Sequence, residues 1–79
     1  MTTLRDVILD EGGIFLRAVR AGRTRTSADI VTAFNLTVAR SEHSSAILVN
    51  HLYDDSDNLV LVIAEKGSQS PLVLPVITN

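Results

Sequence analysis

Apolar residues at the start of the chain recur with a helical period. On a wheel that advances 100° per residue they fall within an arc of roughly 140°, interrupted only by Glu11. The residues on this arc are Leu4, Val7, Ile8, Ile14, Phe15, Ala18 and Val19. Thr3 and Asp6 have the spacing of a capping box, and Gly22 is placed to end the helix. We therefore predict helical structure from about residue 4 to residue 20.

The pair Gly12-Gly13 lies in the middle of this segment. Each glycine costs about 1 kcal/mol relative to alanine inside a helix. The pattern favours one helix, or two helices kinked or broken at the pair. A short helix followed by a strand from Ile14 also fits, as does a hairpin with strands at 4–10 and 14–20.

A second helix is predicted from about residue 27 to residue 40. Thr26 and Asp29 repeat the capping spacing, and four apolar side chains share one helical face: Ile30, Val31, Phe34 and Val38. Residues 34–38 also alternate strictly between apolar and polar, which is typical of a half-buried strand. With strands at 14–20 and 34–38 the fold would be mostly β with one helix.

Three β-branched, apolar runs occupy the last half of the chain, at residues 47–53, 59–65 and 72–77. They are separated by the turn-forming stretches 54–58 and 66–71, so an antiparallel meander is predicted. The middle run is apolar on both alternating faces and should be central. Pro75 lacks an amide donor and sends the third run to an edge.

The predicted fold is α+β: two N-terminal helices packed on a three-stranded antiparallel meander, in a single domain that spans residues 1–79. Two short helices can cover only one face of such a sheet. We expect the other face, at Val60 and Val62, to be covered by self-association or by a partner.

Composition narrows the classes of function. The chain is 46% hydrophobic and 20% charged, which suits a packed core, and this core must be aliphatic because Phe15, Phe34 and Tyr53 are its only aromatic residues. There is no cysteine, which excludes disulfides and thiolate sites. No export signal precedes the fold, and the longest apolar run, 59–64, is too short to span a membrane. A cytoplasmic location without membrane contact is expected.

Charge is distributed unevenly along the sequence. Residues 1–40 hold six arginines against four acids, a net charge of +2, whereas residues 41–79 hold one lysine against five acids, a net charge of −4. The densest basic cluster, Arg17, Arg20, Arg23 and Arg25, is the candidate partner-binding segment. It could contact carboxylates of a protein or backbone phosphates of a nucleic acid. The net charge of −2 and the shortage of aromatics disfavour the second option.

Residues capable of catalysis or metal binding do not form a known motif. His43 and His51 are the candidate general bases, with Glu42 and serines at 41, 44 and 45 nearby. None of these serines lies in a nucleophile elbow, and no paired metal-ligand spacing is present. The acidic run 54–58 lacks the central glycine of a calcium loop and predicts a turn instead. We expect no enzymatic activity, no metal and no cofactor.

These observations predict a small, non-enzymatic protein–protein interaction module. We expect a homodimer that acts as an adaptor or inhibitor by binding a protein partner, in the manner of accessory proteins of bacteria or phages. The alternative is a nucleic-acid-binding or regulatory protein that uses the basic segment Arg17–Arg25.

Overall fold

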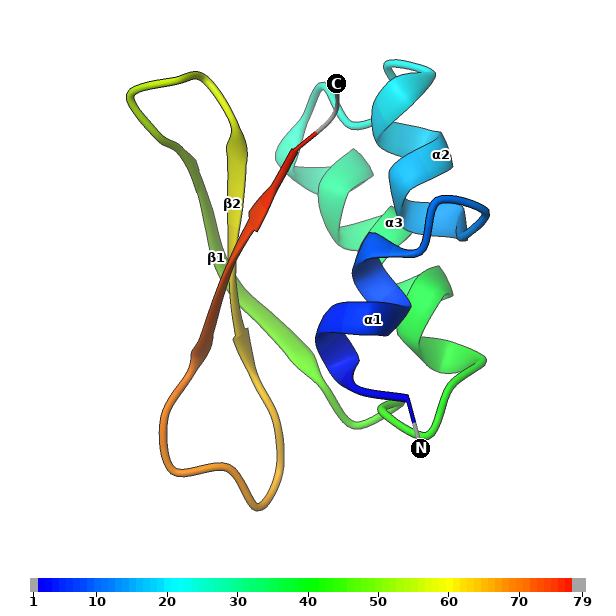
Figure 1. Cartoon of the computed structure of the whole chain (residues 1–79), viewed down its shortest axis with the longest axis vertical. Helices are drawn as coiled ribbons and strands as arrows, with labels where there is room; N and C mark the ends of the chain where they lie inside the picture. The colour runs from blue at the N-terminus through cyan, green and yellow to red at the C-terminus, as the bar shows by residue number, and fades with distance from the viewer. Residues whose placement is uncertain (1, 78–79) are drawn as a thin grey trace.

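The computed structural model describes residues 2–77, in which three helices and a three-stranded antiparallel sheet are formed (Figure 1). In chain order the elements are α1 (Leu4–Leu9), α2 (Ile14–Arg20), α3 (Ser27–Ala39), β1 (Ile47–Tyr53), β2 (Leu59–Ala64) and β3 (Leu72–Val76). The α+β prediction with a C-terminal meander is confirmed. The mostly β alternative and the N-terminal hairpin are wrong.

The first predicted helix is two helices, broken at Gly12-Gly13. The Asp10 side chain accepts a hydrogen bond from the Gly12 amide at 3.1 Å, and the Asp10 carbonyl accepts one from the Gly13 amide at 2.9 Å. These bonds satisfy the backbone where the helix is interrupted. The break also changes which side chains face inward: Leu16, outside the apolar arc of a continuous helix, is buried in the core.

Helix caps form where the sequence predicts them. In α1 the Thr3 hydroxyl accepts from the Asp6 amide, and the Asp6 carboxylate accepts from the Thr3 amide, which completes a capping box. Helix α2 ends at Arg20 and is followed by Gly22 at a φ of +73°. There the amides of Gly22 and Arg23 bond the carbonyls of Val19 and Ala18, which is the Schellman pattern.

Residues 34–38 are helical despite their alternating pattern. Phe34 is fully buried within α3, and the Thr37 hydroxyl donates to the Ala33 carbonyl at 2.7 Å, so this polar side chain is satisfied inside the helix. Thr26 caps the helix by accepting from the Asp29 amide. A helix places Phe34 and Val38 on one buried face, and that burial outweighs the β propensity of the stretch.

The sheet has the order β1-β2-β3, with the doubly apolar strand β2 in the centre and Pro75 on the edge strand β3. Strand β1 has a bulge between Leu48 and Asn50. The acidic run 54–58 is the turn between β1 and β2, where the Asp54 side chain accepts from the amides of Ser56 and Asn58, each at 2.9 Å.

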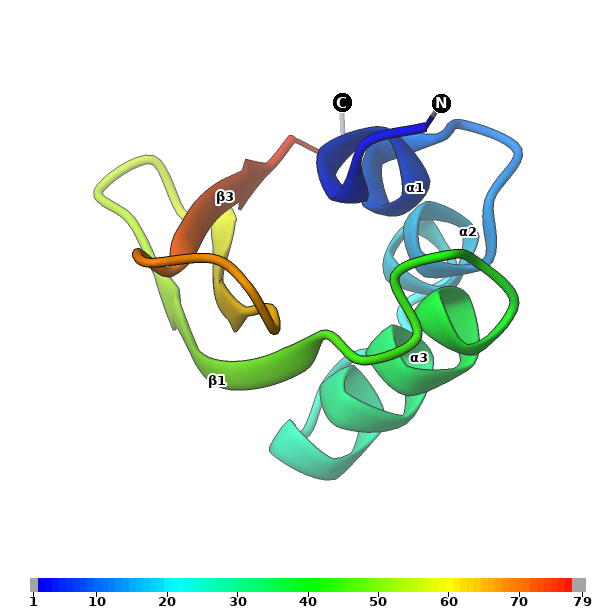
Figure 2. The ribbon, with the colours of Figure 1, turned by 90° about the horizontal axis from the view of Figure 1, so that it is seen from below.

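The three helices form one layer and the sheet forms the other (Figure 2). The core between the layers is aliphatic apart from Phe15 and Phe34 and includes β2 and β3 residues at alternating positions: Leu59, Leu61, Ile63, Leu74 and Val76. The helices cover this face of the sheet only. By the same alternation, the other side chains of these strands point to the opposite face of the sheet.

We predict that Gly22→Ala destabilises the fold by about 1 kcal/mol, because an alanine at positive φ is strained. Gly12→Ala is the matched control, since its added methyl group meets only the Asp10 side chain at 3.9 Å. Its effect should stay within about 0.5 kcal/mol. Urea unfolding followed by circular dichroism measures both. Equal losses in the two variants would contradict the left-handed cap.

Candidate functional site

The face of the sheet that points away from the helices is apolar and carries no charged side chain on its strands. Strand register and alternation place these residues on it: Ile47, Asn50, Leu52, Val60, Val62, Ala64, Val73 and Pro75. The bulge between Leu48 and Asn50 adds Val49, which has no partner in the register. We call this surface the outer sheet face. Ile47, Val49 and Val73 are 65%, 60% and 60% exposed, respectively. Large aliphatic side chains in such number and exposure mark a candidate interaction surface.

The predicted self-association residues Val60 and Val62 lie at the centre of this face. Val60 pairs with Leu52 on one side and Pro75 on the other, and these neighbours bury it. It is not part of the core cluster that packs between sheet and helices. Contact with another molecule would therefore be made by the more exposed residues around Val60, on the two edge strands.

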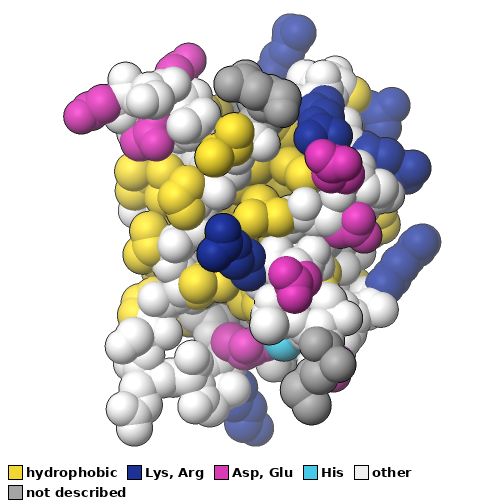
Figure 3. Space-filling model, viewed as in Figure 1, with side chains coloured by type: hydrophobic (Ala, Val, Ile, Leu, Met, Phe, Trp, Pro, Cys, Tyr) yellow, Lys and Arg dark blue, Asp and Glu magenta, His cyan; other side chains and the backbone are white. Residues whose placement is uncertain are grey.

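Hydrophobic and basic side chains are segregated on the surface. Figure 3 shows hydrophobic side chains along the strand side of the molecule and most Lys and Arg side chains over the helices on the opposite side. The acidic turn between β1 and β2 projects at one end of the sheet (Figures 1 and 3). The molecule thus presents an apolar sheet side and a basic helix side.

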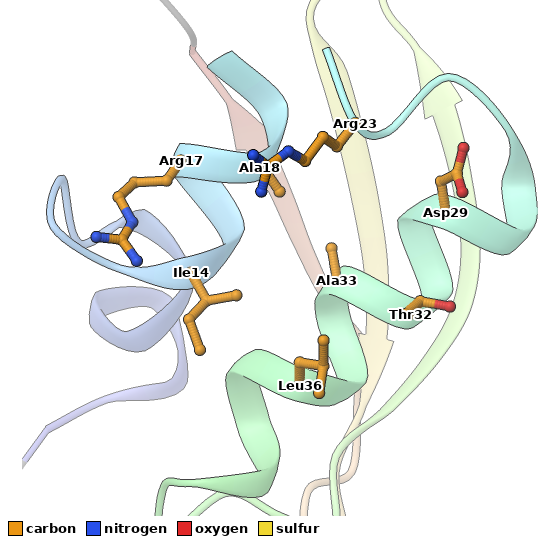
Figure 4. Close-up of a pocket in the computed structure, with 8 residues that line it drawn as sticks. All are labelled: Ile14, Arg17, Ala18, Arg23, Asp29, Thr32, Ala33 and Leu36. Atoms are coloured by element: carbon orange, nitrogen blue, oxygen red, sulfur yellow. The ribbon is translucent and has the colours of Figure 1, made fainter. Parts of the chain in front are cut away.

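The structure does not bring the four arginines of the predicted basic segment into one patch. Arg17 and Arg23 line a groove between α2 and α3, which we call the α2–α3 groove (Figure 4). Arg20 instead lies beside Glu11, with Nη2 4.0 Å from Oε1. The Arg25 guanidinium lies close to Gly22, 3.7 Å from the position of an added Cβ. Only two of the four arginines share a site.

His43 joins three distant parts of the chain. Its Nδ1 lies 2.6 Å from Glu65 Oε2, just after β2, and its Nε2 lies 2.7 Å from the carbonyl oxygen of Thr2, just before α1. Both partners are acceptors, so the doubly protonated imidazolium can donate to both at once. The hydrogen bonds to Thr2 and Glu65 raise the pKa of His43 above its ordinary value of 6.5, and the Glu42 carboxylate, 3.7 Å away, adds to this effect.

His51 is placed apart from His43. Its Nε2 lies 3.0 Å from the Ser27 hydroxyl, so it connects β1 to the start of α3. Through these hydrogen bonds both histidine side chains connect elements of the fold.

Two further structural findings concern residues 2–77. Among them no group of three or more His, Asp or Glu side chains is arranged to hold a metal ion. No helix in this part of the chain has both the length and the apolar character needed to cross a membrane.

Several residues of these surfaces were not identified from the sequence. The exposed members of the outer sheet face on the edge strands, such as Ile47 and Val73, follow from the register, which the sequence does not specify. The groove depends on Ala18 and Ala33 facing each other across two helices. Val60 and Val62, on the strand that is apolar on both faces, are the residues of this face that the sequence predicts.

No protein family, curated protein or solved structure matches this chain.

We predict that the stability of the protein falls as pH rises through the raised pKa of His43. A group with a raised folded-state pKa stabilises the fold fully below its unfolded pKa, about 6.5, and loses this contribution above its folded pKa. Urea unfolding at several pH values between about 5.5 and 8.5 measures the effect. The slope should flatten in His43→Gln and persist in the control His51→Gln. An unchanged slope in His43→Gln would contradict this assignment.

Proposed function

We propose that the chain is a non-enzymatic protein–protein interaction module that pairs with a second copy of itself through the outer sheet face. The observation that carries this proposal is the uncharged, largely aliphatic outer sheet face on a sheet whose other face is packed against helices. An aliphatic surface of this kind gains free energy when it leaves water, at about 25 cal/mol per Å².

The single polar residue among the strand positions of this face is compatible with burial. The Asn50 side-chain oxygen accepts a hydrogen bond from the His51 amide at 2.8 Å, so part of its polar requirement is met within the chain. The side-chain NH₂ group of Asn50 lies on edge strand β1, so it would contact a partner at the margin of the outer sheet face. Burial of the outer sheet face leaves no ionised group without a partner.

The exposed area of the molecule supports a second copy as the occupant. A compact monomer of 8.5 kDa is expected to expose roughly 4,650 Å². The chain exposes 5245 Å², which is about 600 Å² more than that scaling gives. A stable homodimer interface buries at least about 1,200 Å² in total, which is about 600 Å² from each copy.

The shape of the outer sheet face also suits self-pairing. Two sheets pack face to face about 10 Å apart through aliphatic side chains. Around a two-fold axis the same patch meets itself, so a patch without charge has no like-charge repulsion to overcome. The helices would then lie on the two outer sides of the dimer and remain available to a different protein.

In this proposal the dimer acts as an adaptor or inhibitor whose helix side binds a protein partner. A cytoplasmic location belongs to the same proposal, since a fold stabilised without cysteine suits a reducing compartment.

We predict that the double variant Val49→Glu/Val73→Glu is monomeric. Both side chains are 60% exposed, so the free chain tolerates the change, whereas the dimer would bury four carboxylates. The dimer dissociation constant should rise more than about 100-fold. Light scattering over a range of concentrations measures the change as a fall from twice to once the chain mass of 8.5 kDa.

The control for this experiment is Val31→Glu on α3, an exposed valine that is not part of the outer sheet face. It should leave the dimer intact. A native chain that is monomeric at every concentration, or a dimer that survives the double substitution, would refute self-pairing through the outer sheet face. Variants at Val60 are unsuitable because that side chain is already buried within the monomer.

A further inference from the structure

The α2–α3 groove is a largely apolar depression on the helix side, with a volume of about 230 Å³. Its lining residues come from α2, the following loop and α3: Ile14, Arg17, Ala18, Arg23, Asp29, Thr32, Ala33 and Leu36 (Figure 4). It lies on the layer opposite the outer sheet face, so occupation of one surface does not obstruct the other.

Small side chains create the groove. Ala18 on α2 and Ala33 on α3 lie where larger residues would fill the space between the helices. Ile14 and Leu36 extend the apolar lining toward one end (Figure 4). Leu36 is 54% exposed, so a large aliphatic side chain stands at the mouth of the groove. This lining can accept an apolar side chain from another molecule.

The charges at the rim of the groove indicate which charge the bound molecule should carry. Arg23 extends from the loop toward Ala18, and Arg17 leaves α2 on the side away from Asp29 (Figure 4). Across residues 2–77, no ion pair within 4.0 Å involves Arg17 or Arg23. Asp29 is the only carboxylate of the lining, and it lies in the first turn of α3, where the helix dipole favours a negative charge. Two cations therefore remain for an incoming anion.

We propose that the α2–α3 groove binds an acidic, amphipathic peptide segment of a protein partner. An apolar side chain of this segment packs on Ile14, Ala33 and Leu36, and its flanking carboxylates pair with Arg17 and Arg23. This inference rests on the proposed function as an interaction module and adds the site and chemistry of the partner.

The same features disfavour a nucleic acid as the occupant. A phosphate backbone would gain nothing from the aliphatic lining, and no aromatic side chain in the groove can stack a base. The remaining arginines do not extend the rim, because Arg20 lies beside Glu11 and Arg25 lies beside Gly22. An apolar anchor flanked by carboxylates matches both the lining and the rim.

The probe for this proposal is a synthetic helical peptide with leucines on one face and glutamates flanking them. The control peptide is identical except that every glutamate is replaced by lysine. Each is titrated into the full, isotope-labelled chain, and amide shifts are followed by NMR. We expect the acidic peptide to shift the amides of Ala18, Ala33 and Leu36, with an affinity that falls as salt is added. The lysine peptide should not bind there.

Charge-reversal variants test the role of the rim. Arg17→Glu/Arg23→Glu should weaken binding of the acidic peptide at least about tenfold. Arg5→Glu/Arg40→Glu makes the same change in net charge outside the groove and should alter affinity less than about twofold. Equal effects of the two pairs would show that attraction is non-specific and would overturn the site.

A neutral pair of variants tests the apolar anchor. Leu36→Gln should weaken the acidic peptide about tenfold because it removes apolar contact. Val31→Gln, at another exposed position of α3, should leave affinity unchanged. Both positions are exposed, so both variants should fold. Unchanged affinity in Leu36→Gln would refute the anchor.

The remaining outcomes separate this inference from the proposed dimer. Shifts confined to the outer sheet face, or at the groove with a DNA or RNA oligonucleotide in place of the peptide, would refute the acidic-peptide site. Light scattering on the same samples reports self-association independently. A dimer without peptide binding at the groove overturns this inference alone, whereas a monomer that binds the peptide overturns the dimer alone.

Discussion

Strand β2 carries apolar side chains on both of its faces, and the rest of the structure depends on how those faces are covered. The inner side chains Leu59, Leu61 and Ile63 are covered by three helices. On the outer side, Val60 is covered only by its neighbours on β1 and β3, while Val62 stays partly exposed. Residues 2–77 contain no further helix or strand with which to cover this face. The proposed self-pairing follows from this limit, since small domains bury a smaller fraction of their surface than large ones.

The helix layer combines two roles that make different demands on its side chains. Its inner side needs large apolar residues, which Phe15, Leu16 and Phe34 supply. Where α2 meets α3 on the outer side, Ala18 and Ala33 leave a groove instead of a filled contact. Larger residues there would bury more apolar area and stabilise the pair of helices. The groove therefore gives up packing energy, which is the usual condition of a binding site.

The sequence predicted most of the elements and few of the contacts between them. Strand positions, caps and the central place of β2 follow from local patterns, because turn residues and alternation act over a few positions. The break after α1 was left open. Two glycines cost a helix about 2 kcal/mol relative to alanine, and the Asp10 hydrogen bonds made at the break are not visible as a sequence motif.

The candidate sites were harder to predict because they are made by tertiary contacts. Arg17, Arg20, Arg23 and Arg25 are close in sequence, but only Arg17 and Arg23 line the groove, while Arg20 lies beside Glu11 and Arg25 beside Gly22, so sequence proximity did not define a patch. His43 was considered with its neighbour Glu42, whereas its closest carboxylate is Glu65, 22 positions away.

The two proposed surfaces can act independently because they lie on opposite layers of the fold. The outer sheet face includes no residue of α2 or α3, and the α2–α3 groove includes no residue of the sheet. Substitutions at sites that share no partner contribute additively to free energy. A dimer joined through the sheets would present two grooves on its outer sides. A partner with two acidic segments could then occupy both, and its affinity would exceed that of one segment when its linker spans the dimer. Self-association would in this way strengthen partner binding without contributing a contact to the groove.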